Sequence, residues 1–254
     1  MPAPIGLQLW SVRELMKTDP EGTLKKLGEI GYVGVEGGIQ GRSAKEVKDT
    51  FEKYCLRPVS WHGLPTSETA GKLAEDCAAL GLKRVVAGLG PDDMKTMDTI
   101  KAGCDKINAG SREAVKKGLT IGLHNHWWEF SSKVDGKAGF DIMLELLDKE
   151  VFFEVDTYWA NTGGADVPAL LARLGARAPL MHIKDGPADL SDPHKHHVAA
   201  GTGVMDIPSI VKAGTQAEWL IIELDSCATD MMTAVEQSYK YLVGKGLARG
   251  NKPV

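Results

Sequence analysis

Short apolar runs alternate with longer amphipathic segments along the whole chain. The short runs are rich in β-branched residues or flanked by glycine, which is typical of parallel strands buried on both faces. The longer segments repeat apolar residues about every 3.6 positions, which predicts helices that cover such a sheet. The strands we predict are Ile5–Trp10, Val33–Gly37, Arg57–His62, Arg84–Gly88, Leu119–His126, Val151–Asp156, Leu180–Lys184 and Trp219–Asp225.

The helices we predict between these strands are Gly22–Ile30, Ala44–Tyr54, Glu68–Leu80, Asp98–Lys117, Phe140–Leu147, Val167–Leu174, Ile207–Ala213 and Thr229–Val243. Ser43 can cap the second of them, with Glu46 in the capping-box position. Gly31, Gly81 and Gly118 each follow a predicted helix, where left-handed backbone is favoured.

Eight strand–helix units in 254 residues predict an α/β fold, a single (β/α)8 TIM barrel that spans residues 1–254. An open doubly wound sheet is the main alternative. It is disfavoured because no Gly-x-Gly-x-x-Gly motif opens the first helix. No linker-like or low-complexity stretch divides the chain.

Charge and composition narrow the function classes. The net charge is −4, so no basic field exists to gather nucleic acid or an anionic membrane surface. No apolar run reaches the roughly 18 residues of a membrane span, and the N-terminus lacks a signal-like pattern, so we expect a cytoplasmic protein. The four cysteines show no Cys-x-x-Cys spacing, which favours free thiols: Cys55, Cys77, Cys104 and Cys227.

The reactive residue types gather where such a barrel has its active site, at the carboxyl ends of the strands. All seven histidines follow this pattern: His62, His124, His126, His182, and the loop residues His194, His196 and His197. Five of six tryptophans do likewise: Trp10, Trp61, Trp127, Trp128 and Trp159. Such aromatic rings can stack on the apolar face of a sugar, or can simply fill the mouth of the barrel.

Four segments in the second half of the chain combine oxygen and nitrogen donors without any thiolate. GLHNHWWEF supplies His124, His126 and Glu129, FFEVDTYW supplies Asp156, LMHIKDG supplies His182, and WLIIELD supplies Glu223. This donor set suits one exchangeable divalent ion, Mn²⁺, Co²⁺, Mg²⁺ or Zn²⁺. The alternative is a set of salt bridges between the carboxylates and Lys184 or arginines at the barrel mouth.

The ordered motifs IGLQLWSVR, GTLKKLGEIGYVGVE, HNHWWEF, EVDTYWA, MHIKDG and GTGVMDIP resemble the sugar phosphate isomerase/epimerase family, the xylose-isomerase-like TIM barrels, from about Ile5 to Tyr241. Members of that family include ketose 3-epimerases, hydroxypyruvate isomerase, inosose dehydratase and, more distantly, endonuclease IV. The resemblance implies one divalent metal held by Asp156, His182, Glu223 and a fourth residue. Ketose epimerases have a glutamate where His124 stands here, so either His124 or Glu129 is the fourth ligand.

The resemblance further implies proton transfer next to a carbonyl that the metal polarises, through an enediolate-type intermediate. His126 and Glu223 are the candidate bases, with Glu129 in reserve. Lys184 could donate to a substrate oxygen, or could form a salt bridge with Asp185 or Asp156. The residues we expect to bind substrate are Gln8, Trp10, Glu36, His62, Trp128 and Trp159.

Three further features have plainer interpretations. The Gly201–Gly203 turn could bind phosphate through its N–H groups, but a tight turn before the next helix is favoured. The three loop histidines could form a second metal site, but a polar lid or a solvated loop is favoured. Arg13 and Lys17 are the only cations near the first strand end that could meet a phosphorylated substrate.

The sequence therefore predicts a metal-dependent isomerase, epimerase or lyase for a sugar, keto-sugar or cyclitol, with a homodimer possible. A non-catalytic carbohydrate-binding barrel is the alternative, although it has no use for Asp156, His182 and Glu223 together. A nuclease is disfavoured by the acidic charge and by the shortage of histidines on the second and fourth strands.

Overall fold

Nine short strands form one parallel sheet in the residues that the computed structural model describes, 1–193 and 195–254. They are β1 (Ile5–Gln8), β2 (Gly34–Glu36), β3 (Arg57–Pro58), β4 (Trp61–His62), β5 (Arg84–Gly88), β6 (Thr120–His124), β9 (Phe152–Asp156), β10 (Leu180–Ile183) and β11 (Trp219–Ile222). Their order in the sheet is β3-β2-β1-β11-β10-β9-β6-β5-β4.

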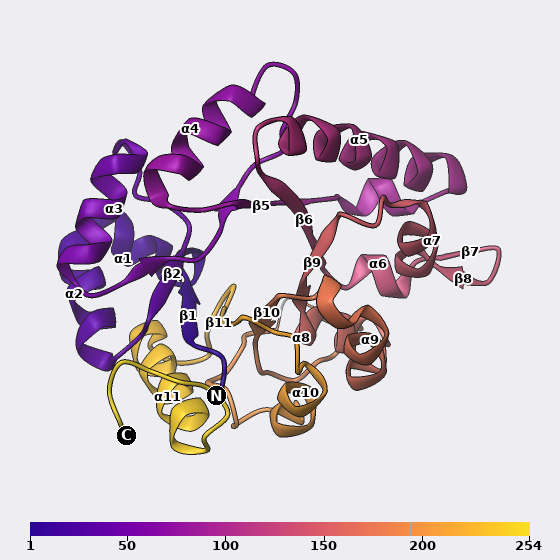
Figure 1. The fold of residues 1–254 in the computed structure, drawn as a ribbon. Helices are drawn as coiled ribbons and strands as arrows, with labels where there is room; N and C mark the ends of the chain where they lie inside the picture. Colours follow the sequence, from indigo (N-terminus) through magenta and orange to yellow (C-terminus); the bar gives the residue numbers. More distant parts are fainter. Residues whose placement is uncertain (194) are drawn as a thin grey trace.

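The sheet closes into a ring because β3 and β4 are two halves of one predicted strand. β3 pairs with β2, and β4 pairs with β5, so the continuous chain between them joins the two edges. The first and last strands also lie side by side, with Ile5 opposite Leu220 (Figure 1). The strands thus occupy eight positions, and the predicted (β/α)8 barrel is confirmed.

Helices surround this ring (Figure 1). They are α2 (Pro20–Ile30), α3 (Ala44–Lys53), α4 (Ala70–Leu80), α5 (Met97–Lys116), α7 (Gly139–Leu146), α9 (Val167–Leu174), α10 (Ile207–Ala213) and α11 (Met231–Gly244). The capping box of Ser43 and Glu46 is present at the start of α3. Gly31, Gly81 and Gly118 have φ angles of 118°, 75° and 72°, as the helix-end pattern predicted.

Several short elements escaped prediction because each is too brief to show a periodic pattern. They are η1 (Leu9–Val12), α1 (Arg13–Thr18), η2 (Pro91–Met94), α6 (Trp128–Ser131), the hairpin β7 (Lys133–Val134) and β8 (Lys137–Ala138), α8 (Thr157–Thr162) and η3 (Gly175–Arg177). Three predicted strands, 5–10, 219–225 and 119–126, were too long, since β1 ends at Gln8, β11 at Ile222 and β6 at His124. The side chain of the next residue, Asn125, bonds both backbone groups of Asp156 on β9, at 3.0 and 3.1 Å, and this fixes the strand end.

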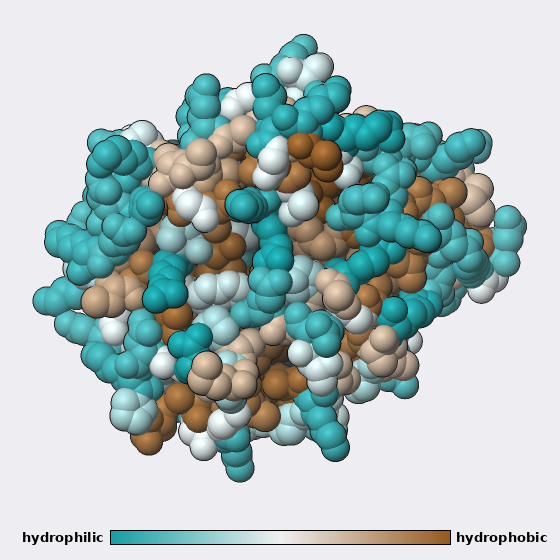
Figure 2. Space-filling model, viewed as in Figure 1, coloured by the Kyte–Doolittle hydropathy of each residue, from teal (hydrophilic) through white to brown (hydrophobic). Residues whose placement is uncertain are grey.

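Apolar side chains fill the space between the ring and its helices, and a smaller group closes one end of the barrel interior. The interior group consists of Val59, Val86, Phe152, Leu180 and Ile221. Hydrophilic side chains cover much of the outer helices in the view of Figure 2. In the described part of the chain, no helix combines the length and the apolar character needed to cross a bilayer.

Candidate metal centre

The polar centre of the barrel follows from the two-residue period of its strands. Side chains two positions apart on a strand face the same side. The interior residues Phe152, Leu180 and Ile221 are each followed two positions later by a polar residue, and again two positions after that. The resulting series are Phe152, Glu154 and Asp156 on β9; Leu180 and His182 on β10 with Lys184 just after it; and Ile221 on β11 with Glu223 and Asp225 just after it. The sequence therefore stacks charged groups above an apolar floor.

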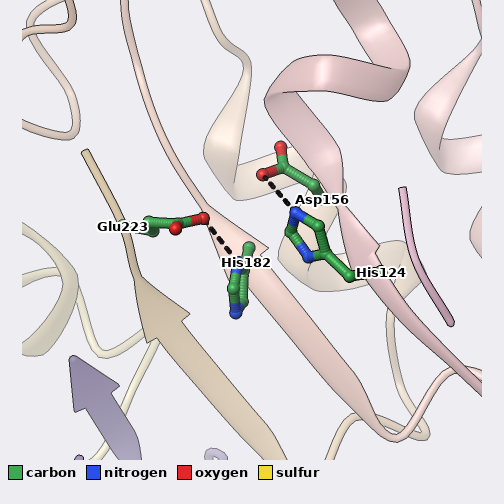
Figure 3. A group of neighbouring side chains, drawn as sticks. All are labelled: His124, Asp156, His182 and Glu223. Atoms are coloured by element: carbon green, nitrogen blue, oxygen red, sulfur yellow. Dashed lines mark hydrogen bonds and ion pairs between the residues drawn. The ribbon is translucent and has the colours of Figure 1, made fainter. Parts of the chain in front are cut away.

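Four side chains from neighbouring strands converge in this layer: His124, Asp156, His182 and Glu223. One possible ligand atom from each lies within 4.8 Å of the others. Figure 3 shows the four pointing toward one another, with Nδ1 of His182 2.7 Å from Oε2 of Glu223 and Nε2 of His124 3.9 Å from Oδ2 of Asp156. Two imidazoles and two carboxylates, three of them buried, are a donor set that fits a divalent cation.

Lys184 is the cation that faces these carboxylates. Its buried ammonium group lies 2.9 Å from Asp156, 2.8 Å from Glu223 and 2.7 Å from Asp225. Burial opposes its charge, but the three carboxylates outweigh this and raise its pKa well above the ordinary value. Of the two salt bridges considered for Lys184, the one to Asp156 is therefore present.

The imidazoles of the centre are in two different electrostatic states. Burial opposes the charge on His182, but Glu154, Glu223 and Glu36 outweigh it and raise its pKa well above 6.5. Burial, together with the nearby His182, lowers the pKa of His124 to about 4. Burial and the neighbouring His124 lower the pKa of His126 to about 3. His124 and His126 are therefore neutral near pH 7, the form that binds a metal or accepts a proton.

A cavity of about 790 Å³ opens above this centre. Three of the four converging residues, His124, His182 and Glu223, contribute to its wall, as does His126. The predicted substrate-binding residues that line it are Gln8, Trp10 and His62. Trp10 presents its ring to solvent with 55% of its surface exposed, so an apolar sugar face could stack there.

Two of the tryptophans that we expect to bind substrate, Trp128 and Trp159, do not line this cavity. Trp159 is only 4% exposed and packs against Trp127, Tyr158 and His197, so it fills the barrel mouth rather than the cavity wall. Trp128 is also absent from the cavity wall. It stacks on His126 with ring centroids 4.1 Å apart and donates to the carbonyl of Leu89, which places it behind the imidazole.

Glu129, the reserve ligand and base, lies outside the group of four. Its buried carboxyl accepts a hydrogen bond from the backbone N–H of His126 at 2.9 Å. Burial raises its pKa to about 8. Between the two alternatives for the fourth ligand, the geometry thus favours His124, and Glu129 instead fixes the turn that carries His126.

The structure reveals a buried carboxylate that the sequence interpretation missed, Glu154. Its Oε2 lies 3.2 Å from Nδ1 of His124 and 3.4 Å from Nε2 of His182. Burial and the nearby Glu36 raise its pKa to about 8. The motif FFEVD contained the signal, because Glu154 precedes Asp156 by two positions and so faces the same side.

Glu36 is fully buried, so it lies below the cavity surface on which we expected it to bind substrate. Its carboxylate accepts from Nε2 of Gln8 at 2.9 Å, contacts Nε2 of His62, and lies 3.1 Å from Nε2 of His182. Burial opposes the charge on His62, but Glu36 outweighs it and raises the pKa of His62 to about 9.

The Asp185 side chain, just after β10, fixes the turn at residues 201–205. The Asp185 carboxylate accepts from the N–H groups of Gly201, Gly203 and Met205 at 2.9, 3.0 and 3.1 Å, which favours the tight turn over the phosphate site.

His197 is buried and accepts from the N–H of Asp225, whereas His196 is exposed. His194 lies outside the described residues.

Comparison with known proteins agrees with this geometry. The model of the family described as xylose isomerase-like TIM barrel matches residues 24–242. No curated protein matches the chain. Among solved structures, a sugar phosphate isomerase/epimerase from Parabacteroides distasonis is 24% identical to this chain, with a TM-score of 0.81. The match covers 98% of this chain and 96% of that protein.

Two more distant structures share the fold. One, described as the IOLI protein with a binding zinc atom, is 16% identical with a TM-score of 0.67, and the match covers 96% of this chain and 99% of that one. The other, an L-ribulose 3-epimerase, is also 16% identical with a TM-score of 0.69, covering 96% and 94%. The resemblance inferred from the motifs is confirmed.

Proposed function

The chain belongs to the xylose isomerase-like TIM barrel family, and we propose that it is a divalent-metal-dependent isomerase, epimerase or lyase for a sugar, keto-sugar or cyclitol. The observation that carries this proposal is the convergence of His124, Asp156, His182 and Glu223 beneath a cavity that three of them line. A protein that only binds a sugar has no need for these four groups below its cavity, because burying ionisable groups costs free energy.

These four residues would hold the metal. When bound, the ion would supply Lewis-acid stabilisation of the negative charge that develops on substrate oxygens during enolisation. Lys184 remains the counter-charge of Asp156 and Glu223, and its three carboxylate partners leave it little freedom to donate to substrate. We therefore propose that Lys184 orients the two carboxylates rather than contacting the sugar.

His126 is the proposed general base. It lines the cavity and is neutral near pH 7; its ring stacks on Trp128, and its backbone N–H donates to Glu129. Its ring centroid lies 5.0 Å from that of His124, so it could reach a proton on a substrate bound at the centre. Glu223, which directly follows β11 and lines the cavity, is the second proposed proton carrier.

We propose a neutral substrate because the nearby cations are already engaged. Arg13 donates to the carbonyls of Trp10 and Asp225 at 2.8 and 2.9 Å and lies over the Trp10 ring. Lys17 pairs with Glu14 at 2.8 Å. A phosphate group would have to displace these partners, whereas a neutral sugar could stack on Trp10.

The test is to screen ketoses, keto-glycosides and keto-cyclitols for exchange of the proton α to the carbonyl in D₂O by NMR. With the active compound, His126→Ala should lower turnover and exchange by about 10² or more while the metal content stays unchanged. His196→Ala, at an exposed imidazole, is the control. A His126→Ala protein with normal exchange and turnover would refute the proposed base.

A further inference from the structure

A second group of potential ligands lies beside the first and is left unused by the proposed chemistry. It consists of Glu36 on β2, His62 on β4 and Glu154 on β9, with one ligand atom from each within 4.8 Å of the others. Both carboxylates are fully buried. The imidazole of His182 stands between the groups, since its Nδ1 faces Glu223 and its Nε2 faces Glu36 and Glu154.

This second group has two buried carboxyl groups and, among the residues that the structure describes, no lysine or arginine beside them. In the described part of the chain, no lysine or arginine lies within ion-pair distance of Glu36 or Glu154, and their only basic neighbours are imidazoles. Lys184 is committed to Asp156, Glu223 and Asp225 instead. Two buried carboxylates in contact are costly unless a cation or protons offset them.

Glu154 supplies an independent indication of a missing partner. Both of its oxygens are buried and neither has a hydrogen-bond partner in good geometry, although the Glu36 carboxyl is its neighbour and ring nitrogens of three histidines lie within 3.8 Å. Buried carboxylate oxygens almost always have a partner. Glu154 is thus a side chain aimed at a position that a ligand would complete.

We propose that Glu36, His62 and Glu154 bind a second divalent cation next to the four-residue centre. Gln8 would orient the Glu36 carboxylate through its hydrogen bond, as residues behind a metal ligand commonly do. The side chain of His62 is 44% exposed and lines the cavity, which provides a route for the ion and leaves room for substrate oxygens or water. Oxygen and imidazole donors suit Mn²⁺, Mg²⁺ or Zn²⁺.

Two adjacent ions would favour a particular substrate chemistry. A two-metal site can bind neighbouring oxygens of one substrate and stabilise charge on both. The cavity would then select sugars or cyclitols with a carbonyl beside a free hydroxyl. This inference does not require the proposed reaction, because metal binding to the second group is measured directly.

The experiment titrates the chelator-stripped, full-length protein with Mn²⁺ and measures bound ion by calorimetry and by the EPR signal of free Mn²⁺. Wild type should bind about two equivalents per chain. His62→Ala and Glu154→Gln should each bind about one, because each lacks a ligand of the second group. Asp156→Asn should also bind about one, since it keeps the second group but not the first. His196→Ala should match wild type.

Circular dichroism of the stripped variants verifies that each is folded, and His62→Ala is the decisive variant because its side chain is partly exposed. Wild-type EPR should show spin coupling between two ions, and the coupling should vanish in His62→Ala. A wild type that binds a single equivalent, lost in Asp156→Asn but kept in His62→Ala, would overturn the second site while leaving the proposed function intact. A second equivalent that persists in both His62→Ala and Glu154→Gln would overturn it as well.

Discussion

At the scale of single residues, burial and neighbouring charges set the charge state of each ionisable group in the barrel interior. Lys184 stays charged because three carboxylates surround it. His124 and His126 stay neutral because burial disfavours the imidazolium form. A metal can therefore bind His124 without first displacing a proton, whereas His182, held among carboxylates, must release one.

Glu129 makes a pH-dependent contribution to stability. Its pKa is raised from 4.5 to about 8 by burial, so the unfolded chain releases this proton at lower pH than the folded protein does. The Glu129 contribution to the free energy of unfolding should therefore fall as pH rises from about 4.5 to about 8. Glu129→Gln keeps an acceptor for the His126 N–H but cannot ionise, so the metal-free variant should lose less stability over this range, by on the order of 3 kcal/mol.

Urea denaturation of the metal-free proteins at a series of pH values measures this difference. Glu75→Gln, at an exposed position on α4, is the control and should follow wild type. Identical pH profiles for wild type and Glu129→Gln would show that the Glu129 carboxyl is not held protonated in the fold.

At the scale of elements, the site is built where strands end and the chain turns at once. Asp156 ends β9 and also caps α8, accepting from the N–H of Trp159 at 2.9 Å. The sequence predicted the strands and covering helices because their apolar patterns are long. It did not predict α1, α6 or α8, which are short and are fixed by single side-chain contacts. Trp128 lies on α6 and Trp159 on α8, so the sequence could not show how their rings lie relative to the cavity.

The two-residue period of the strands determines which polar residues share the barrel interior. It puts His182 and Lys184 on the same side of the chain inside the barrel, and in FFEVD it puts Glu154 on the same side as Asp156. For His126 the period did not apply, since β6 ends at His124. The imidazole reaches the cavity because the turn held by Asn125 and Glu129 directs it there.

Asp185 should be the most sensitive position in the loop after β10. Asp185→Ala removes the acceptor of three N–H groups in residues 201–205 and leaves them buried or partly buried without a partner. The expected loss is on the order of 3 kcal/mol in the free energy of unfolding, measured with urea. Asp189→Ala, an exposed-loop carboxylate that bonds Ser191 and Lys195, should change it far less. Equal losses in both variants would contradict the anchoring role.

At the scale of the whole molecule, closure of the ring is what creates the site. Glu36 and His182 contact each other although 146 positions separate them, and this requires β2 and β10 to face the same interior. The sequence, with its family resemblance, named four residues that the structure brings together. It did not reveal the adjoining group, because contacts across a barrel depend on its closed shape rather than on any local pattern.

The most direct test of the account is the metal content of Asp156→Asn, which keeps a side chain able to cap α8 but removes a charged ligand. Elemental analysis of wild type and variant, purified with the same divalent ion, should show that the variant has lost about one equivalent per chain and its catalytic turnover. A circular dichroism spectrum and a thermal unfolding curve like those of wild type would confirm that the variant has kept its fold and that the loss of metal is local. A folded Asp156→Asn protein with the full metal content of wild type would contradict the assignment of His124, Asp156, His182 and Glu223 as the metal centre.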